Sequence, residues 1–234
     1  MKMYFCGYRS WAKEIYNNLI KESGLEILLI QNKQQFNEIE NLNNEILFFI
    51  GWSWILEKEI VENNYCICLH PSKLPKYRGG SPIQHQIING EKESAVTLFK
   101  MNEFVDKGNI LFQENFSLDG DLNDVFRRIS IIGAKGINQI INKFINNTEI
   151  HELEQDFKKG SYCRRRKPHM SEIKIVDLKN QTAEQLYNKI RALQDPYPNA
   201  YITCADGKKL YLFGAKTDLQ INQISSFYSR SIKK

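Results

Sequence analysis

The chain has 234 residues, of which 42% are hydrophobic and 25% charged, and it carries a formal net charge of +5. This composition is typical of a globular protein with one large domain, or with one domain and a small addition. The longest apolar run, ILFFIGWSWIL, contains a glycine and a serine and is too short to span a membrane, and the N-terminal MKMYFC does not predict a secretory signal.

The expected elements of the first half alternate between apolar strands and helices. Strands are expected at residues 2–6, 25–31, 44–51 and 65–70, and helices at 11–23 and 54–64. The first helix has Ser10 as its expected N-cap. Its buried face is expected to consist of Trp11, Ile15, Leu19 and Ile20. This alternation indicates a mostly parallel, Rossmann-like sheet covered on both faces, an α/β fold that binds ligands at the carboxyl ends of its strands.

The second half of the chain is less regular. Helices are expected at 81–90, 121–147 and 182–193, strands at 94–101 and 109–118, and a hairpin turned on Asp206-Gly207 at 200–216. Residues 151–180 are polar and indicate an irregular connection. The sequence therefore predicts a main domain over residues 1–180 and a small helix-plus-hairpin subdomain over residues 181–234.

The cysteines and basic residues bear on compartment and partners. Among five scattered cysteines, Cys66 and Cys68 are expected on one face of a strand, and no second pair completes a zinc site. Reduced thiols, no metal and a cytoplasmic location are therefore predicted. Much of the positive charge lies in residues 164–167 and in the tail SRSIKK. No aromatic residues are interleaved with these clusters, so they indicate a solvated loop and tail rather than a nucleic-acid site, and no membrane partner is expected.

His70 ends the fourth expected strand, where this architecture places ligands. A single histidine there is as readily structural as catalytic, but the loop that follows, PSKLPKYRGG, is long, irregular and bounded by prolines and glycines, which indicates a binding site. Within it Tyr77 and Arg78 offer an aromatic ring and a guanidinium that suit a sugar or a phosphate. Asp106, in a loop between two expected strands, is a candidate to orient His70 as a general base and then a general acid.

The run HPSKLPKYRGG resembles the motif of formyltransferases that use 10-formyltetrahydrofolate, together with Val96-Thr97 and the downstream Asp106-x-Gly108-x-Ile110. That family includes methionyl-tRNA formyltransferase, glycinamide ribonucleotide formyltransferase and the sugar N-formyltransferases. The resemblance extends more weakly over the N-terminal sheet and reaches the segment IRALQDPYPNAY. It implies that His70 acts as base and acid while a substrate amine attacks the formyl carbon, and that Asp106 holds His70 and balances its charge.

The resemblance also implies how the folate donor is held. The stretch FIGWSWIL aligns with the pterin-binding loop of the family, so Trp52, Trp54 and Ile55 are the implied folate-binding residues, together with Asp106. The alternative is that the two tryptophans fill an edge of the core.

Cys68 departs from the family pattern, which has its catalytic asparagine at this position. The asparagine would donate a hydrogen bond to the developing oxyanion, a contribution of roughly 3 kcal/mol, whereas a thiol is a weak donor. Three interpretations stay open. His70 and backbone N–H groups suffice for catalysis, or the protein is a catalytically silent folate or nucleotide-sugar binding protein, or Cys68 takes the formyl group covalently.

Among the branches of the family, the resemblance favours the sugar N-formyltransferases, which formylate the amine of a dTDP- or UDP-linked amino-deoxy sugar for surface polysaccharide such as O-antigen lipopolysaccharide. About 55 residues follow the catalytic unit, too few for the tRNA-binding barrel of the methionyl-tRNA enzyme. The glycinamide ribonucleotide enzyme typically lacks the Tyr-Arg-Gly run, and it remains an alternative. The expected substrate contacts are Arg9, Lys76, Tyr77, Arg78 and Gly79.

Three candidates are equally well explained without a contact to substrate. Arg9, at the start of the first helix, suits a diphosphate and suits plain solvation. Gln84 and His85 are candidates for contact with the base or sugar and equally for a structural role. The hairpin is expected to pair across a two-fold axis, which predicts a homodimer.

Overall fold

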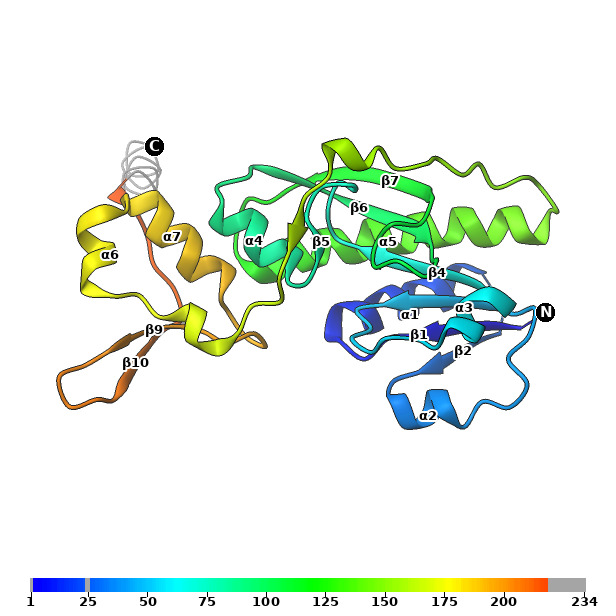
Figure 1. Ribbon diagram of the computed structural model, residues 1–234, viewed down its shortest axis with the longest axis horizontal. Coiled ribbons are helices and arrows are strands. Elements are labelled where there is room, and N and C mark those ends of the chain that lie inside the picture. The colour runs from blue at the N-terminus through cyan, green and yellow to red at the C-terminus, as the bar shows by residue number, and fades with distance from the viewer. Residues whose placement is uncertain (1, 24–25, 219–234) are drawn as a thin grey trace, which may run out of the picture. The chain divides into compact units, whose positions relative to one another are not determined.

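The computed structural model describes residues 2–23 and 26–218 of the chain (Figure 1). Its central sheet has the strand order β2-β1-β3-β4-β6-β7. These strands are β1 (Met3–Cys6), β2 (Ile27–Ile30), β3 (Ile46–Ile50), β4 (Tyr65–His70), β6 (Glu93–Lys100) and β7 (Ile110–Ser117). The first four strands are parallel, and β6 and β7 run antiparallel at one edge. The predicted mostly parallel α/β sheet is confirmed.

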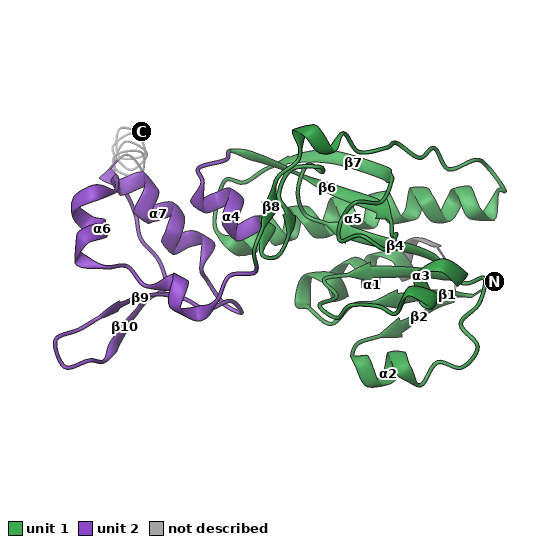
Figure 2. Ribbon diagram, in the orientation of Figure 1, with its two compact units in different colours: residues 1–82, 92–164 green, residues 83–91, 165–234 purple. Residues whose placement is uncertain are grey.

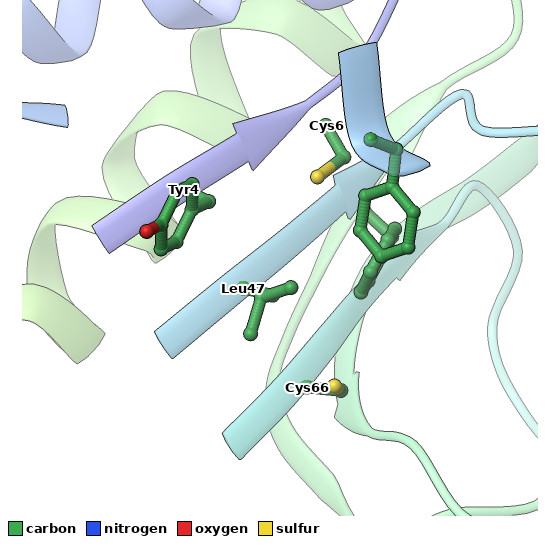
Figure 3. Close-up of a cluster of buried hydrophobic side chains, with 6 residues drawn as sticks. Tyr4, Cys6, Leu47 and Cys66 are labelled. Carbon is green, nitrogen blue, oxygen red and sulfur yellow. The ribbon is translucent and has the colours of Figure 1, made fainter. Parts of the chain in front are cut away.

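The two faces of the sheet carry separate apolar layers, because successive side chains of a strand point to opposite sides. Figure 3 shows one layer, in which Tyr4, Cys6, Leu47 and Cys66 project from three neighbouring strands. Phe36 completes this cluster from the short helix α2 (Lys33–Asn37), and helix α3 (Lys58–Asn63) packs beside it. Cys68, two residues after Cys66, packs against the same cluster, as its position in the strand predicts.

Helices α1 (Ser10–Ser23) and α5 (Leu122–Ile145) cover the opposite face. The hydroxyl of Ser130 in α5 donates to the carbonyl of Trp11 in α1 at 3.0 Å, which joins the two helices. A Cβ atom at Gly133 would lie 2.7 Å from the Ile15 side chain and 2.9 Å from that of Leu69, so α5 packs closely on both α1 and β4 at this glycine. The start of α5 is fixed by a capping box.

Several element boundaries differ from the prediction. Helix α1 begins at Ser10, and the N–H of Lys13 donates to the carbonyl of Arg9. Arg9 and not Ser10 is therefore at the N-cap position, one residue before the expected one. Helix α3 begins at Lys58 rather than at residue 54. Helix α2 was not expected; its polar sequence has no apolar periodicity, and the side chain of Asn32 caps it. The side chain of Ile20 and the basic tail lie outside the described residues.

The chain divides into two compact units (Figure 2). The larger unit comprises residues 1–82 and 92–164, and the second comprises residues 83–91 and 165–234. The second unit contains most of α4 (Pro82–Ile88), with α6 (Ile175–Asn180), α7 (Ala183–Ala192) and the hairpin β9 (Ala200–Thr203) and β10 (Lys209–Leu212). The boundary between the two compact units therefore falls after Arg164. The predicted domain boundary at residue 180 stays a prediction.

The connection between residues 151 and 180 has more structure than its polar sequence indicates. It contains two 3-10 turns, Phe157–Lys159 and Pro168–Ser171, the strand β8 (Tyr162–Cys163) and helix α6. Within the basic run, Arg166 is half-buried and donates to the carbonyl of Met170 at 2.6 Å. Burial lowers the pKa of this guanidinium, so the predicted solvated loop is wrong at this residue.

None of the helices in the described part of the chain is both long enough and apolar enough to cross a bilayer.

Candidate active site

The loop that follows β4 is held by buried hydroxyl and amide groups. The hydroxyl of Ser72, which has no solvent exposure, donates to the carbonyl of Lys76 at 2.7 Å. Thr97 on β6 donates to the carbonyl of Ser72 at 2.7 Å. Gln113 on β7 donates both to the carbonyl of Leu74, at 3.1 Å, and to the Thr97 hydroxyl, at 2.9 Å. Three of these bonds end on backbone carbonyl oxygens, and together they hold the loop in one conformation although its sequence is irregular.

The C-terminal end of this loop pairs with the connecting segment, residues 151–180. Strand β5 (Arg78–Gly79) is parallel to β8, and the backbone N–H of Tyr77 donates to the Ser161 hydroxyl at 2.8 Å. Gly79 has a φ of +94°, and a Cβ atom there would lie 2.3 Å from the carbonyl oxygen of Cys163. No larger residue fits this position, which explains the glycine after Arg78.

His70 makes two contacts through its ring. Its Nε2 lies 2.7 Å from the carbonyl oxygen of Tyr77, and its Nδ1 lies 3.5 Å from Oδ2 of Asp106. A carbonyl oxygen only accepts, so Nε2 carries a hydrogen. Nδ1 is therefore the nitrogen that is able to take up a proton, and an imidazolium there would face a carboxylate. Both side chains are largely buried, at 7% and 13% exposure, so the pair is weakly screened.

Asp106 is brought to His70 by a tight loop between β6 and β7. Its backbone has a φ of +54°, which is rare for a residue other than glycine. Oδ2 also accepts the backbone N–H of Gly79 at 2.7 Å. A Cβ atom at Gly108 would lie 1.6 Å from the carbonyl oxygen of Lys100, so the loop can close against β6 only with glycine here.

Cys68 lies on the same face of β4 as His70 and within the electrostatic reach of Asp106. Burial raises the pKa of its thiol well above the usual value, and the charges of Asp106 and Cys66 raise it further. The thiol is therefore neutral, and a neutral thiol is a poor nucleophile. Among the interpretations of this position, the geometry disfavours the covalent one.

The loop after β3 carries the residues implied to bind folate. Trp52 packs edge to face on Phe49 and on Trp54, with ring centroids 6.0 and 4.6 Å apart, and its indole N–H is buried without an acceptor among the described residues. Trp54 is 37% exposed and Ile55 is 92% exposed. A pterin is flat and carries hydrogen-bond acceptors, so it could accept from the Trp52 indole N–H and pack on the exposed Trp54 and Ile55 side chains. These residues therefore fit the pterin head of folate. Trp52 also packs at the edge of the core, whereas its contact with folate stays a prediction.

The remaining candidates fall in different places. Arg9 lies over the ring of Tyr8 at 5.2 Å, and Tyr8 in turn contacts Trp54 at 5.1 Å, so Arg9 belongs beside the folate-loop candidates. Lys76 is exposed in the loop after His70. Arg78 places its guanidinium over the ring of Phe157 at 5.3 Å, while its Nε and Nη1 have no acceptor among the described residues.

Two further candidates belong to helix α4. Gln84 is buried, and His85 is half-buried. Both lie in the second compact unit, whereas the other candidates lie in the first.

Two contributors to this site were not expected. Gln113 supports the loop after His70, and the buried Gln155 donates to the loop that carries Asp106. Isolated glutamines in a strand and in a polar connection resemble solvent-facing residues, so no sequence pattern pointed to them.

The fold and the site together define an α/β protein with a largely buried histidine–aspartate pair at the carboxyl end of a central parallel strand. Comparison with known proteins then identifies the family. Residues 6–139 match the formyl transferase model and residues 170–229 match the model of the formyl transferase C-terminal domain. The chain belongs to the formyl transferase family, and the predicted folate-dependent formyltransferase family is confirmed.

Two curated relatives are methionyl-tRNA formyltransferases. Methionyl-tRNA formyltransferase of Lysinibacillus sphaericus is 34% identical over 194 residues, which are 80% of this chain and 60% of that protein. Methionyl-tRNA formyltransferase of Syntrophomonas wolfei is 28% identical over 82% of this chain and 60% of its own length. The chain thus spans about 60% of the length of these curated relatives.

The similar solved structures carry more than one kind of name. Methionyl-tRNA formyltransferase from Clostridium thermocellum has a TM-score of 0.73 and 28% identity, over 90% of this chain and 96% of that chain. A 4-N formyltransferase from Francisella tularensis has a TM-score of 0.69 and 25% identity, over 92% of this chain and 86% of that chain. A structure of an N-formyltransferase from Helicobacter canadensis, 24% identical, contains folinic acid and dTDP-3-aminofucose, and its likeness shows the fold.

Proposed function

We propose that this protein transfers the formyl group of 10-formyltetrahydrofolate to the amine of a dTDP- or UDP-linked amino-deoxy sugar. The observation that carries the transfer chemistry is the buried His70–Asp106 pair, with Nδ1 of the imidazole facing a carboxylate that is itself fixed by the N–H of Gly79. Family membership and the fit of the Trp52–Ile55 loop to a pterin support the folate donor.

The folate supplies the formyl carbon, to which the substrate amine forms a new C–N bond while the bond to the folate nitrogen breaks. Nδ1 of His70 takes the proton that the amine loses and returns it to the leaving nitrogen. Asp106 stabilises the imidazolium in between, because the carboxylate lies 3.5 Å from Nδ1 in a largely buried setting.

Cys68 stays outside the bond-making steps in this proposal. Its neutral, buried thiol is a weak hydrogen-bond donor where the family has an amide. The oxyanion is then stabilised by the His70 imidazolium and by backbone N–H groups. The competing possibility is a protein that binds folate and nucleotide sugar without turnover.

The sugar acceptor is supported by the loop that begins at His70. Tyr77, Arg78 and Gly79 lie at the far end of this loop, and two guanidinium nitrogens of Arg78 lack an acceptor within the described chain. A nucleoside diphosphate supplies such acceptors. Lys76, exposed in the same loop, adds positive charge. The product would enter surface polysaccharide, and the reaction would take place in the cytoplasm, in keeping with five free thiols.

Methionyl-tRNA is the second candidate acceptor. It is favoured by the names of the curated relatives and by the match of residues 170–229 to the C-terminal domain of the family. This chain covers 96% of the methionyl-tRNA formyltransferase structure from Clostridium thermocellum, so the number of residues after the catalytic unit does not count against this acceptor.

A second copy of the chain is the proposed partner. The hairpin exposes Leu210, Tyr211 and Phe213, each about half or more accessible, and a two-stranded sheet leaves strand edges that can pair. Sedimentation velocity should give a dimer. The substitutions Leu210→Lys and Phe213→Lys should together give a monomer, and a monomeric wild type would contradict this part of the proposal.

One assay tests the function. The protein is incubated with 10-formyltetrahydrofolate and, separately, with dTDP- and UDP-linked 3- and 4-amino sugars, with methionyl-tRNA and with glycinamide ribonucleotide, and formylated products are detected by mass spectrometry. We expect a formylated sugar, with kcat reduced by about 10³ in His70→Ala and Asp106→Ala. His151→Ala, which removes an exposed histidine, is the matched control and should be fully active.

Other outcomes discriminate among the alternatives. Formylation of methionyl-tRNA or of glycinamide ribonucleotide but of no sugar would replace the proposed acceptor. Folate binding without transfer to any acceptor, with transfer appearing in Cys68→Asn, would establish the silent binding protein.

A further inference from the structure

The carbonyl oxygens on both sides of Lys107 share one donor. Nε2 of Gln155 donates to the carbonyl of Asp106 at 3.0 Å and to that of Gly108 at 2.7 Å. The Gln155 residue is only 7% exposed. Because both neighbours are carbonyl oxygens, the amide nitrogen and not the amide oxygen must face the loop. One side chain thus ties together the backbone of the loop that carries the aspartate.

Gln155 is itself fixed by contacts outside that loop. Ile110, at the start of β7, and Leu153 exchange two backbone hydrogen bonds, of 2.8 and 2.9 Å. One residue earlier, Glu152 accepts a hydrogen bond from Lys100 on β6 at 3.0 Å. The segment that precedes Gln155 is therefore attached to two strands of the sheet, and it presents the amide to the loop from a rigid support.

Asp106 needs such a support because of its own backbone. Its φ of +54° lies in the left-handed region, where a non-glycine residue remains only if its surroundings hold it. Its Oδ2 has to serve the N–H of Gly79 and Nδ1 of His70 at once. A rotation about the Asp106 backbone would move this oxygen away from both.

We infer that Gln155 is a positioning residue, which through the backbone of Asp106 keeps the carboxylate at Nδ1 of His70. Both of its hydrogen bonds end on backbone carbonyl oxygens rather than on the ring or the carboxylate, so it acts through the loop. The competing explanation is that Gln155 merely closes the connection onto the sheet, which would affect stability alone.

The first test separates turnover from stability. Gln155→Met keeps the length of the side chain and removes both donors. We expect kcat to fall about tenfold to a hundredfold with the KM for folate unchanged, as for a misplaced catalytic group. The matched control is Glu154→Gln, at an exposed position of the same segment, which should leave both the melting temperature and kcat unchanged. Equal kcat values for Gln155→Met and wild type would overturn the inference.

The second test does not need the acceptor. The kinetic readout rests on the proposed function, whereas the 15N chemical shifts of the His70 ring report on its contact with Asp106 in the free protein. We expect Gln155→Met to shift these signals in the direction of Asp106→Asn, and to add nothing in the Asp106→Asn background, because both act on one contact.

Unchanged His70 signals in Gln155→Met, or an undiminished change in the Asp106→Asn background, would refute the positioning role. Should Gln155→Met not fold, Gln155→Glu, which keeps the shape without an N–H donor, is judged by the same signals. A wild type that formylates nothing would contradict the proposed function and leave this measurement valid.

Discussion

Oδ2 of Asp106 lies 3.5 Å from Nδ1 of His70, although His70 ends strand β4 and Asp106 belongs to the loop between β6 and β7. The loop after β4 places the imidazole, and the loop between β6 and β7 places the carboxylate. Substitution of a residue that holds either loop in place should therefore alter the distance between His70 and Asp106.

Gly108→Ala should disrupt the site more than any comparable glycine substitution away from it. A Cβ atom would lie 1.6 Å from the Lys100 carbonyl oxygen, so the loop must open. We expect a loss of about 2–4 kcal/mol in the free energy of unfolding, measured with urea, together with loss of turnover. Gly214→Ala, with no heavy atom within 4 Å, is the control and should change stability by less than about 0.5 kcal/mol. A stable, active Gly108→Ala would mean that the loop is not closed as described.

The thiol of Cys68 should be inert in the folded protein. Burial raises the pKa of Cys68 well above its usual value, and burial raises that of Cys66 to about 12. Cys204 is exposed. Brief treatment with iodoacetamide at pH 7.5, followed by peptide mass mapping, should label Cys204 first and leave Cys68 unlabelled until the protein is unfolded. Rapid labelling of Cys68 with loss of turnover would revive the covalent interpretation.

Glu152 should make stability depend on pH in the acid range. Although burial opposes ionisation, hydrogen bonds from Asn109 and Lys100 and the charge of Lys100 hold its pKa below the usual value. A lowered pKa means that the ionised form stabilises the fold, so this contribution is present above the usual glutamate pKa, about 4.3, and is lost as the pH falls through the lowered value.

The substitution Glu152→Gln measures this contribution. It should cost about 1 kcal/mol at pH 7, and the difference from wild type should shrink toward zero below pH 4. Urea unfolding over a pH series checks this. Glu154→Gln, at an exposed neighbouring position, should show no such trend. A difference that stayed constant with pH would contradict the ionised role of Glu152.

Substitutions in the loop after β3 should distinguish a core residue, Trp52, from a predicted folate contact, Ile55. Trp52 packs in the apolar cluster with Phe36 and Phe49, so Trp52→Ala should lower stability by about 3 kcal/mol. Ile55 is 92% exposed, so Ile55→Ala should leave stability unchanged and weaken folate binding, measured by calorimetry. Ile131→Ala, at an exposed position of helix α5, should change neither. Unaltered folate affinity in Ile55→Ala would remove Ile55 from the site.

Much of this protein is determined by local sequence. The apolar runs of β1, β3 and β4 specify buried parallel strands, because only a sheet covered on both sides buries such continuous runs. Likewise the motif around His70, with Asp106 and Gly108, was sufficient to predict the family and the loops that meet at the site. These features depend on residue type and spacing along one stretch of chain.

Other features were decided only by the tertiary structure. Gln155 and Gln113 are ordinary polar residues in sequence, and they become part of the site because folding presents carbonyl oxygens to their amides. Likewise, Arg166 belongs to a run of charge that reads as solvated, yet its side chain is half-buried. A hydrogen bond between residues distant in the chain depends on where both backbones end up, and no local periodicity encodes that. The sequence alone therefore determined which loops carry the chemistry, whereas the packed structure decided which polar side chains hold those loops in place.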